Sequence, residues 1–245
     1  MARAIIGLSG WSYDSWRDDF YRDVPKKDWL AHYATVFSAV EINATFYGQQ
    51  RSSTLEKWRA SVPDGFSFVV KANRFLTHTR RLAVERDSIA KARQQCQPLG
   101  EQAAAVLYQL PASFRKDLDR LQRFADLLQC HFRGPHHCFE LRHPSWFDAE
   151  SERCLEDNGL VNVVSDAADW PRFDTVTGPA AYLRLHGHSR TYRSRYSSGL
   201  LTDFADRARG WLAAGRNVYA FFDNTDEGCA PRDARRFREL VTGGG

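Results

Sequence analysis

Paired cysteines and long apolar runs are both missing from this sequence. The five cysteines are scattered, and no two of them form a Cys-x-x-Cys pair. This argues against a zinc ribbon and against a secreted disulfide framework. No segment approaches the ~20 apolar residues that a membrane-spanning helix needs, and the apolar stretch near the N-terminus is too short for a signal peptide. We therefore expect no membrane partner and a cytoplasmic location.

The chain also has no strong charge imbalance and no low-complexity linker. Its 34 basic residues are set against 30 acidic ones, so the net charge is weak support for nucleic-acid binding. A length of 245 residues and a hydrophobic fraction of 43% fit one α/β barrel, for which about 250 residues is typical. We expect a single domain over residues 1–242, followed by a short frayed tail at 243–245.

Eight short apolar segments are spaced along the chain, and most of the stretches between them carry helical patterns. Alternating strands and helices predict a parallel sheet, and eight strands predict a single (β/α)8 TIM-type barrel. The predicted strands are 5–8, 39–43, 66–71, 103–110, 137–141, 161–166, 180–185 and 217–223. The predicted helices are 27–37, 53–60, 85–96, 117–128, 149–157, 202–214 and 231–240. The stretch before residue 180 contains Trp170-Pro171 and Gly178-Pro179, so the sixth helix of the barrel is expected to be short or missing.

Most of these strands end in a charged or amide residue, and a parallel barrel gathers such ends at one mouth. Side chains alternate along a strand, and the apolar face packs on the helices. This alternation, called parity below, predicts that Val164 and Asp166 of the sixth strand face the lumen. For the eighth strand it leaves open whether Asp223 or Asn224 faces the lumen. The other polar side chains expected to face inward are those of Glu41, Asn43, Lys71, Gln109, Glu140, Arg142, Arg184 and His186.

The sequence resembles the YecE-like family, also called domain of unknown function 72, whose members are similar to TIM barrels. The resemblance covers nearly the whole chain and rests on segments at residues 7–13, 41–47, 68–72, 77–78, 109–111, 139–146, 182–187 and 221–224. It implies the barrel fold and names no reaction, because the family has no settled activity. One departure is Asp223-Asn224, where relatives often carry two asparagines.

Charge at the C-terminal face of a barrel is where barrel enzymes carry their chemistry. We expect acid–base catalysis on a small polar, anionic or sugar-like substrate, with catalytic roles for Glu41, Glu140, His186 and Lys71. Guanidinium groups bind carboxylate or phosphate well. The residues expected to contact the substrate are Asn43, Tyr47, His78, Gln109, Arg142, Trp146, Arg184 and Asn224.

Three other interpretations stay open. The first is a divalent metal held by Glu140, Asp166, His186 and Asp223, which would fit a metal-dependent phosphoesterase acting on nucleic acid, although no His-Glu-x-x-His motif is present. The second is a binding or scaffold protein without turnover. The third is a purely structural ion-pair network, since such networks also gather charges. Cofactor, substrate and oligomeric state are left open by the sequence.

Overall fold

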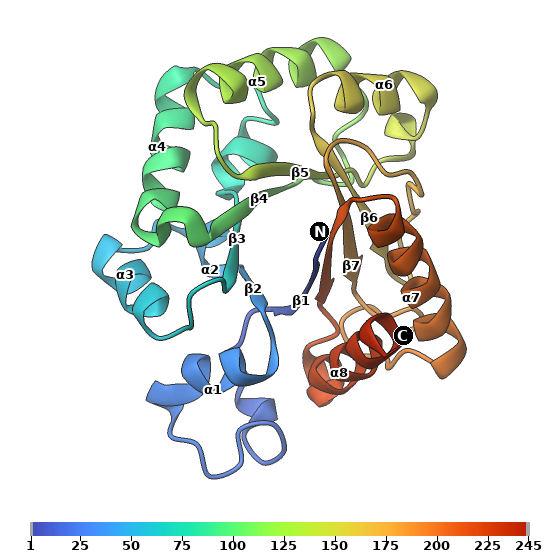
Figure 1. Cartoon of the computed structure of the whole chain (residues 1–245). Helices are drawn as coiled ribbons and strands as arrows, with labels where there is room; N and C mark the ends of the chain where they lie inside the picture. The colour runs from blue at the N-terminus through green and yellow to red at the C-terminus, as the bar shows by residue number, and fades with distance from the viewer. Residues whose placement is uncertain (1, 244–245) are drawn as a thin grey trace.

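Eight parallel strands close into a barrel, and the helices surround it on the outside (Figure 1). The computed structural model describes residues 2–243. Each strand pairs with the next and β8 pairs with β1, so the sheet leaves no open edge. This confirms the predicted (β/α)8 barrel. The strands are β1 (Ala4–Ser9), β2 (Ala39–Ile42), β3 (Ser67–Lys71), β4 (Ala103–Gln109), β5 (His136–Glu140), β6 (Val161–Asp166), β7 (Ala180–Leu185) and β8 (Asn217–Phe222).

The helices follow the expected alternation with one gap. They are α1 (Trp29–Val36), α2 (Ala44–Tyr47), α3 (Ser52–Ala60), α4 (Arg86–Cys96), α5 (Leu118–His131), α6 (Ala149–Asp157), α7 (Ser198–Ala213) and α8 (Cys229–Thr242). Residues 167–179, between β6 and β7, contain no helix, as the two X-Pro pairs predict. The sequence pattern did not predict α2 or the π-helical turn Phe75–Thr79. Of the predicted frayed tail, residues 244–245 lie outside the described residues.

Side chains of the strands divide into a lumen layer and an outer layer. The outer layer joins the strands to the helices in one large core, in which Trp16, Phe68 and Phe124 are fully buried. Burial of each such side chain stabilises the fold by about 1.5–3 kcal/mol. The lumen layer is a separate apolar cluster. Its members are Ile5, Ala39, Val69, Ala105, Leu107, Cys138, Val161, Val163, Ala180, Tyr182, Tyr219 and Phe221.

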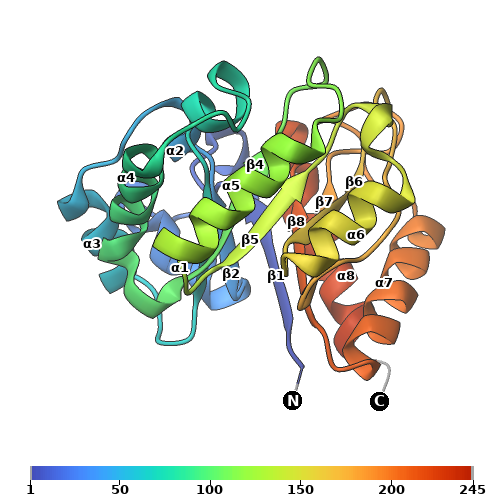
Figure 2. The same cartoon turned by 90° about the horizontal axis from the view of Figure 1, so that it is seen from above.

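The two faces of the barrel differ in what they carry. Strand β1 begins and helix α8 ends on the same side of the molecule, and the loops that follow the strands lie on the opposite side (Figure 2). Glu41, Lys71, Glu140 and Arg184 are at or next to the last residue of their strands. The polar strand ends therefore gather on the face away from the start of β1 and the end of α8. Among residues 2–243, no helix is long and apolar enough to cross a bilayer.

Strand β6 does not face as parity predicted. Val163 belongs to the lumen cluster and Val164 to the outer core, so the prediction that Val164 and Asp166 face inward is wrong. Ser165 faces the lumen instead. Valines lie on both sides of this strand, so the sequence does not show which side packs on the helices. The polar residue Asn162 lies on the outer side, where its Nδ2 donates to the carbonyls of Phe173 and Thr175 in the following loop.

Candidate active site

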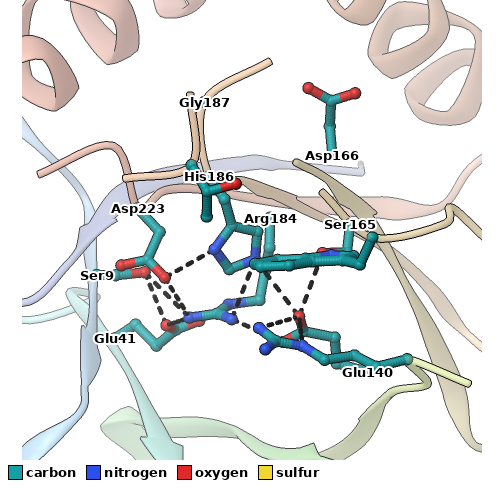
Figure 3. A network of polar contacts seen from close by, with 12 residues as sticks. Ser9, Glu41, Glu140, Ser165, Asp166, Arg184, His186, Gly187 and Asp223 are labelled. Carbon is teal, nitrogen blue, oxygen red and sulfur yellow. Dashed lines mark hydrogen bonds and ion pairs between the residues drawn. The ribbon is translucent and has the colours of Figure 1, made fainter. Parts of the chain in front are cut away.

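A buried ion-pair network lies at the C-terminal ends of the strands, centred on Arg184 of β7 (Figure 3). Arg184 Nε donates to Glu41 Oε2 at 3.0 Å, Nη1 donates to Glu140 Oε2 at 2.6 Å, and Nη2 donates to Asp223 Oδ2 at 3.2 Å. The side chains of Arg184, Glu41 and Glu140 are fully buried. Burial favours loss of the proton, but the three carboxylates hold the pKa of Arg184 well above its usual value. One permanent cation thus connects β7 with β2, β5 and the end of β8.

Glu41 is saturated with hydrogen bonds from the protein. Ser9 Oγ donates to Oε1 at 2.8 Å, and the hydroxyl of Tyr182 donates to Oε2 at 2.7 Å. Together with Arg184, these donors occupy both carboxylate oxygens. Ser9 and Tyr182 were not among the predicted site residues. Both were identifiable in principle, since they belong to the segments that carry the family resemblance and Tyr182 has the lumen parity of Arg184.

Glu140 is the second fixed carboxylate of the network. Arg142 Nε donates to Oε1 at 3.0 Å, Ser165 Oγ donates to the same oxygen at 3.2 Å, and His186 Nε2 lies 3.4 Å from it. Burial raises the pKa of Glu140, but Arg142, Arg184 and His186 outweigh it and hold the pKa well below its usual range. Glu140 is therefore a charged acceptor throughout the neutral pH range.

His186 is enclosed by charged groups. Its Nδ1 lies 2.9 Å from Asp223 Oδ2, and Arg184 Nη1 lies 3.3 Å from its Nε2. Burial opposes ionisation of Asp223, yet Arg184 and His186 bring its pKa below the ordinary value. The ambiguity in the last strand is resolved, because Asp223 faces the lumen.

Trp170 covers the network from the helix-free stretch between β6 and β7. The Cζ atom of Arg142 lies 4.0 Å from the centre of the Trp170 ring, and the indole N–H donates to Ser165 Oγ at 3.2 Å. The ring also packs edge-on against His186, with 4.8 Å between centroids. Sequence reasoning treated Trp170 only as part of a helix-breaking segment. Its role depends on tertiary contacts that no local pattern indicates.

Lys71 differs from Arg142 and Arg184, the two arginines of the network, which both form ion pairs. It is mostly buried at the end of β3, yet its Nζ forms no ion pair with any residue in the range 2–243. The centre of the Phe46 ring lies 4.6 Å from Nζ. Burial, and then the charge of Arg184, lower the pKa of Lys71 to about 8, against the opposing effect of Asp223, Glu41 and Glu140. A large fraction of this amine is therefore neutral near pH 8.

His78 also contacts Phe46. Its ring packs edge-on against Phe46 at 5.0 Å, and Thr77 Oγ1 lies 3.0 Å from its Nδ1. Burial and the charges of Lys71 and Arg142 lower its pKa. Phe46 thus has an unpaired amine and an uncharged imidazole beside it, both partly exposed.

A cavity of about 480 Å³ borders Lys71 on the helix side of β3. It lies between β3 and α4, and its wall includes the polar side chains of Thr45 and Asn73 and the apolar side chains of Val70 and Leu76. This volume is within the range of small-molecule sites. The end of β3 therefore separates the charged network in the lumen from a cavity large enough for a small ligand.

The remaining predicted contacts divide between the mouth and other places. Asn43, with a buried and unpartnered Oδ1, and Gln109 lie at the strand ends of the mouth. Tyr47 is at the rim, with 77% of its surface exposed. The assignments of Trp146 and Asn224 to the substrate do not fit the geometry. Trp146 is fully buried and donates to the carbonyl of Phe114, and Asn224 is fully buried on the outward side.

Asn224 and Asp166 instead hold the loop between β7 and α7. Asn224 Nδ2 donates to the carbonyl of Ser194 at 2.9 Å and to Asp233 Oδ2 at 2.8 Å. The hydroxyl of Tyr196 donates a hydrogen bond to Asp166 Oδ2 at 2.9 Å. Figure 3 shows the Asp166 side chain pointing away from the network. Both side chains lie on the outward parity of their strands, which is why a lumen assignment fails.

The four side chains proposed as metal ligands do not converge. Asp166 lies apart from Glu140, His186 and Asp223, and the guanidinium of Arg184 lies between the two other carboxylates. Within residues 2–243, no group of three or more His, Cys, Asp or Glu side chains is arranged to hold a metal ion. The proposed ligand set therefore does not fit a metal, and no step is assigned to one.

The fold and the site define a (β/α)8-barrel protein with an arginine-centred charge network at the C-terminal mouth and one unpaired, partly buried lysine beside it. The model of the family described as "Protein of unknown function DUF72" matches residues 5–244. The chain belongs to this family, and the predicted resemblance is confirmed.

Relatives of this chain match it over nearly their whole lengths. The curated UPF0759 protein YunF of Bacillus subtilis (strain 168) is 26% identical over 96% of this chain and 94% of its own. A crystal structure of a DUF72 family protein from Thermotoga maritima MSB8 superposes with a TM-score of 0.86 at 24% identity, covering 98% of this chain and 99% of that one. A DUF72 family protein from Enterococcus faecalis V583 gives a TM-score of 0.82 at 21% identity, covering 98% and 95%. The two structural likenesses support the barrel fold.

Proposed function

We propose that this protein is an enzyme that carries out acid–base chemistry on a small polar substrate with an anionic group at the C-terminal mouth of the barrel. The observation that carries the proposal is the isolated amine of Lys71, which is mostly buried and without an ion-pair partner in the described chain. A structural lysine in such a place would be expected to pair with a carboxylate, since burial of an unpaired charge costs free energy. Three carboxylates lie close by, but Arg184 binds all of them.

The properties of Lys71 suit proton transfer at neutral pH. A general base works best when its pKa is close to the operating pH, and the pKa of Lys71 is lowered from 10.5 to about 8. Glu41 and Glu140 are less suited to be acid and base, because their oxygens are occupied by donors from the protein. In this proposal they set the charge of the site, and Lys71 moves the proton.

Arg142 is the better of the two arginines for binding an anionic group. Its side chain keeps 12% of its surface exposed, whereas Arg184 is fully buried among carboxylates. The guanidinium is stacked on Trp170, which fixes the plane of its donors for a carboxylate or phosphate. His78 supplies an uncharged imidazole for a second proton transfer.

Incubation of the purified protein with a pool of small anionic metabolites, followed by mass spectrometry, tests the proposal. Wild type and Lys57→Met, which changes an exposed lysine on α3, are expected to consume the same compound. Lys71→Met is expected to lose activity by about 10²- to 10⁴-fold, the usual contribution of a general acid or base. The rate should rise with pH and level off above about 8, because the neutral amine is the base. Turnover by Lys71→Met at the wild-type rate would refute the assignment.

A further inference from the structure

We infer that Lys71 acts as a nucleophile that forms an imine with the carbonyl carbon of a small aldehyde or ketone bearing a carboxylate or phosphate. This inference rests on the proposed function and narrows its substrate class. An amine becomes a Schiff-base nucleophile when it is desolvated or placed beside another cation. Lys71 meets both conditions, since burial and then the positive charge of Arg184 are the two influences that lower its pKa.

The position of the amine leaves its lone pair available. Among residues 2–243, no side chain within ion-pairing distance engages Nζ, which lies 4.6 Å above the ring of Phe46. Lys116, in the loop that follows β4, instead pairs with Asp148 and with Glu150. Lys71 can therefore reach a bound carbonyl group without first breaking an ion pair.

The surroundings also favour the product. The imine formed by a lysine is protonated and carries one positive charge, so it needs the same compensation as a lysine ammonium. Phe46 offers its ring face to a cation, and the carboxylates of Glu41, Glu140 and Asp223 favour positive charge at this position. A protonated imine can therefore take the place of the ammonium without a new unpaired charge.

The lone pair of neutral Lys71 Nζ attacks the carbonyl carbon, and the π electrons of the C=O bond move to oxygen. One proton then passes from nitrogen to that oxygen and gives a carbinolamine. A second proton, from solvent, reaches the hydroxyl group, water leaves, and the nitrogen lone pair forms the C=N bond.

Several charged or titratable groups surround this reaction and set its pH dependence. They are Glu41 on β2, Glu140 at the end of β5, Arg142 in the loop after β5, Arg184 on β7, Asp223 after β8, and Arg74 and His78 after β3. The pKa of Lys71 is lowered to about 8, so the protonation of this amine changes near that pH. Imine formation is therefore expected to increase up to about that pH.

Reductive trapping tests the inference. The full chain is incubated with glyoxylate, pyruvate or dihydroxyacetone phosphate, with hydroxyacetone as the uncharged probe, and sodium cyanoborohydride is added. Intact-mass and peptide analysis are expected to show one adduct per chain, on Lys71, with at least one anionic probe. Lys57→Arg should label as wild type does, whereas Lys71→Arg and Lys71→Met should not. Arg142→Gln, checked for folding by its melting curve, should lower trapping of the anionic probe about tenfold relative to hydroxyacetone, since one charge-assisted contact is lost.

The outcomes separate the two proposals. Adducts spread over exposed lysines, or equal labelling of wild type and Lys71→Met, would overturn the imine. If Lys71 titrates near pH 8 and is not trapped by any probe, the imine is overturned and acid–base chemistry by Lys71 stands. If Lys71 titrates near 10.5, the ordinary value, both proposals fail.

Discussion

At the residue scale, Lys71 is expected to lower the stability of the fold. Its pKa in the folded protein lies below the value of 10.5 for a free lysine, so folding disfavours its charged form. This penalty is fully present below pH 8 and disappears as the pH rises toward 10.5, because the unfolded chain then also loses the proton. One pKa unit corresponds to about 1.4 kcal/mol, so Lys71→Met is expected to stabilise the protein at pH 7 by up to about 3 kcal/mol. Urea unfolding at pH 7 and pH 10 checks this, with Lys57→Met as the control. An equal loss of stability at both pH values would show that Lys71 is structural.

The residue scale also shows where sequence reasoning reached its limit. Parity placed Glu41, Lys71, Glu140 and Arg184 at the mouth, and the structure puts all four there. It could not indicate which cation pairs with which carboxylate, since that depends on side-chain reach across the barrel. Arg184 extends its guanidinium to three carboxylates and leaves Lys71 without one. The sequence pattern therefore could not predict that the amine of Lys71 is unpaired, which is the most informative property of the site.

At the element scale, the contact between β1 and β2 requires a glycine. A Cβ atom on Gly7 would lie 2.0 Å from the carbonyl oxygen of Ala39, which is far inside van der Waals contact with a backbone atom. Gly7→Ala is therefore expected to push these strands apart and cost about 1–3 kcal/mol or more. The control is Gly48→Ala, because no atom lies within 4 Å of a Cβ at that position. Thermal melts of the two variants make the comparison, and equal melting temperatures would contradict this account of the β1–β2 contact.

The positions of the strands were easier to predict than the side chains that each strand points toward the lumen. The strands were found because apolar runs and turn signals alternate regularly, and β7 was correctly oriented because its leucines mark an outward face. β6 was not, because Val161, Val163 and Val164 lie on both of its sides. The helix-free stretch after β6 was predicted from its prolines, but its Trp170 contact with the network was not.

At the scale of the whole molecule, the network joins strands that are distant around the barrel. Arg184 contacts residues of β2 and β5 and the residue that follows β8. Removal of this guanidinium leaves three buried or nearly buried carboxylates without their shared cation, and loss of one partner of a buried ion pair typically costs about 3–5 kcal/mol. For a protein of this size, each kcal/mol lowers Tm by roughly 2–4 °C. Arg184→Met is therefore expected to melt about 10 °C lower than wild type.

The control is Arg232→Met, which breaks an exposed pair with Asp19 and should change Tm little. Similar melting temperatures for the two variants would contradict a structural role for the network.

The titration of Lys71 tests the central claim most directly. Nuclear magnetic resonance of lysine side chains labelled with ¹³C at Cε follows each amine through pH 6–11, and the signal missing from Lys71→Arg assigns Lys71. The account predicts a midpoint of about 8 for Lys71. A Lys71 midpoint near 10.5, the ordinary value for a lysine, would contradict it.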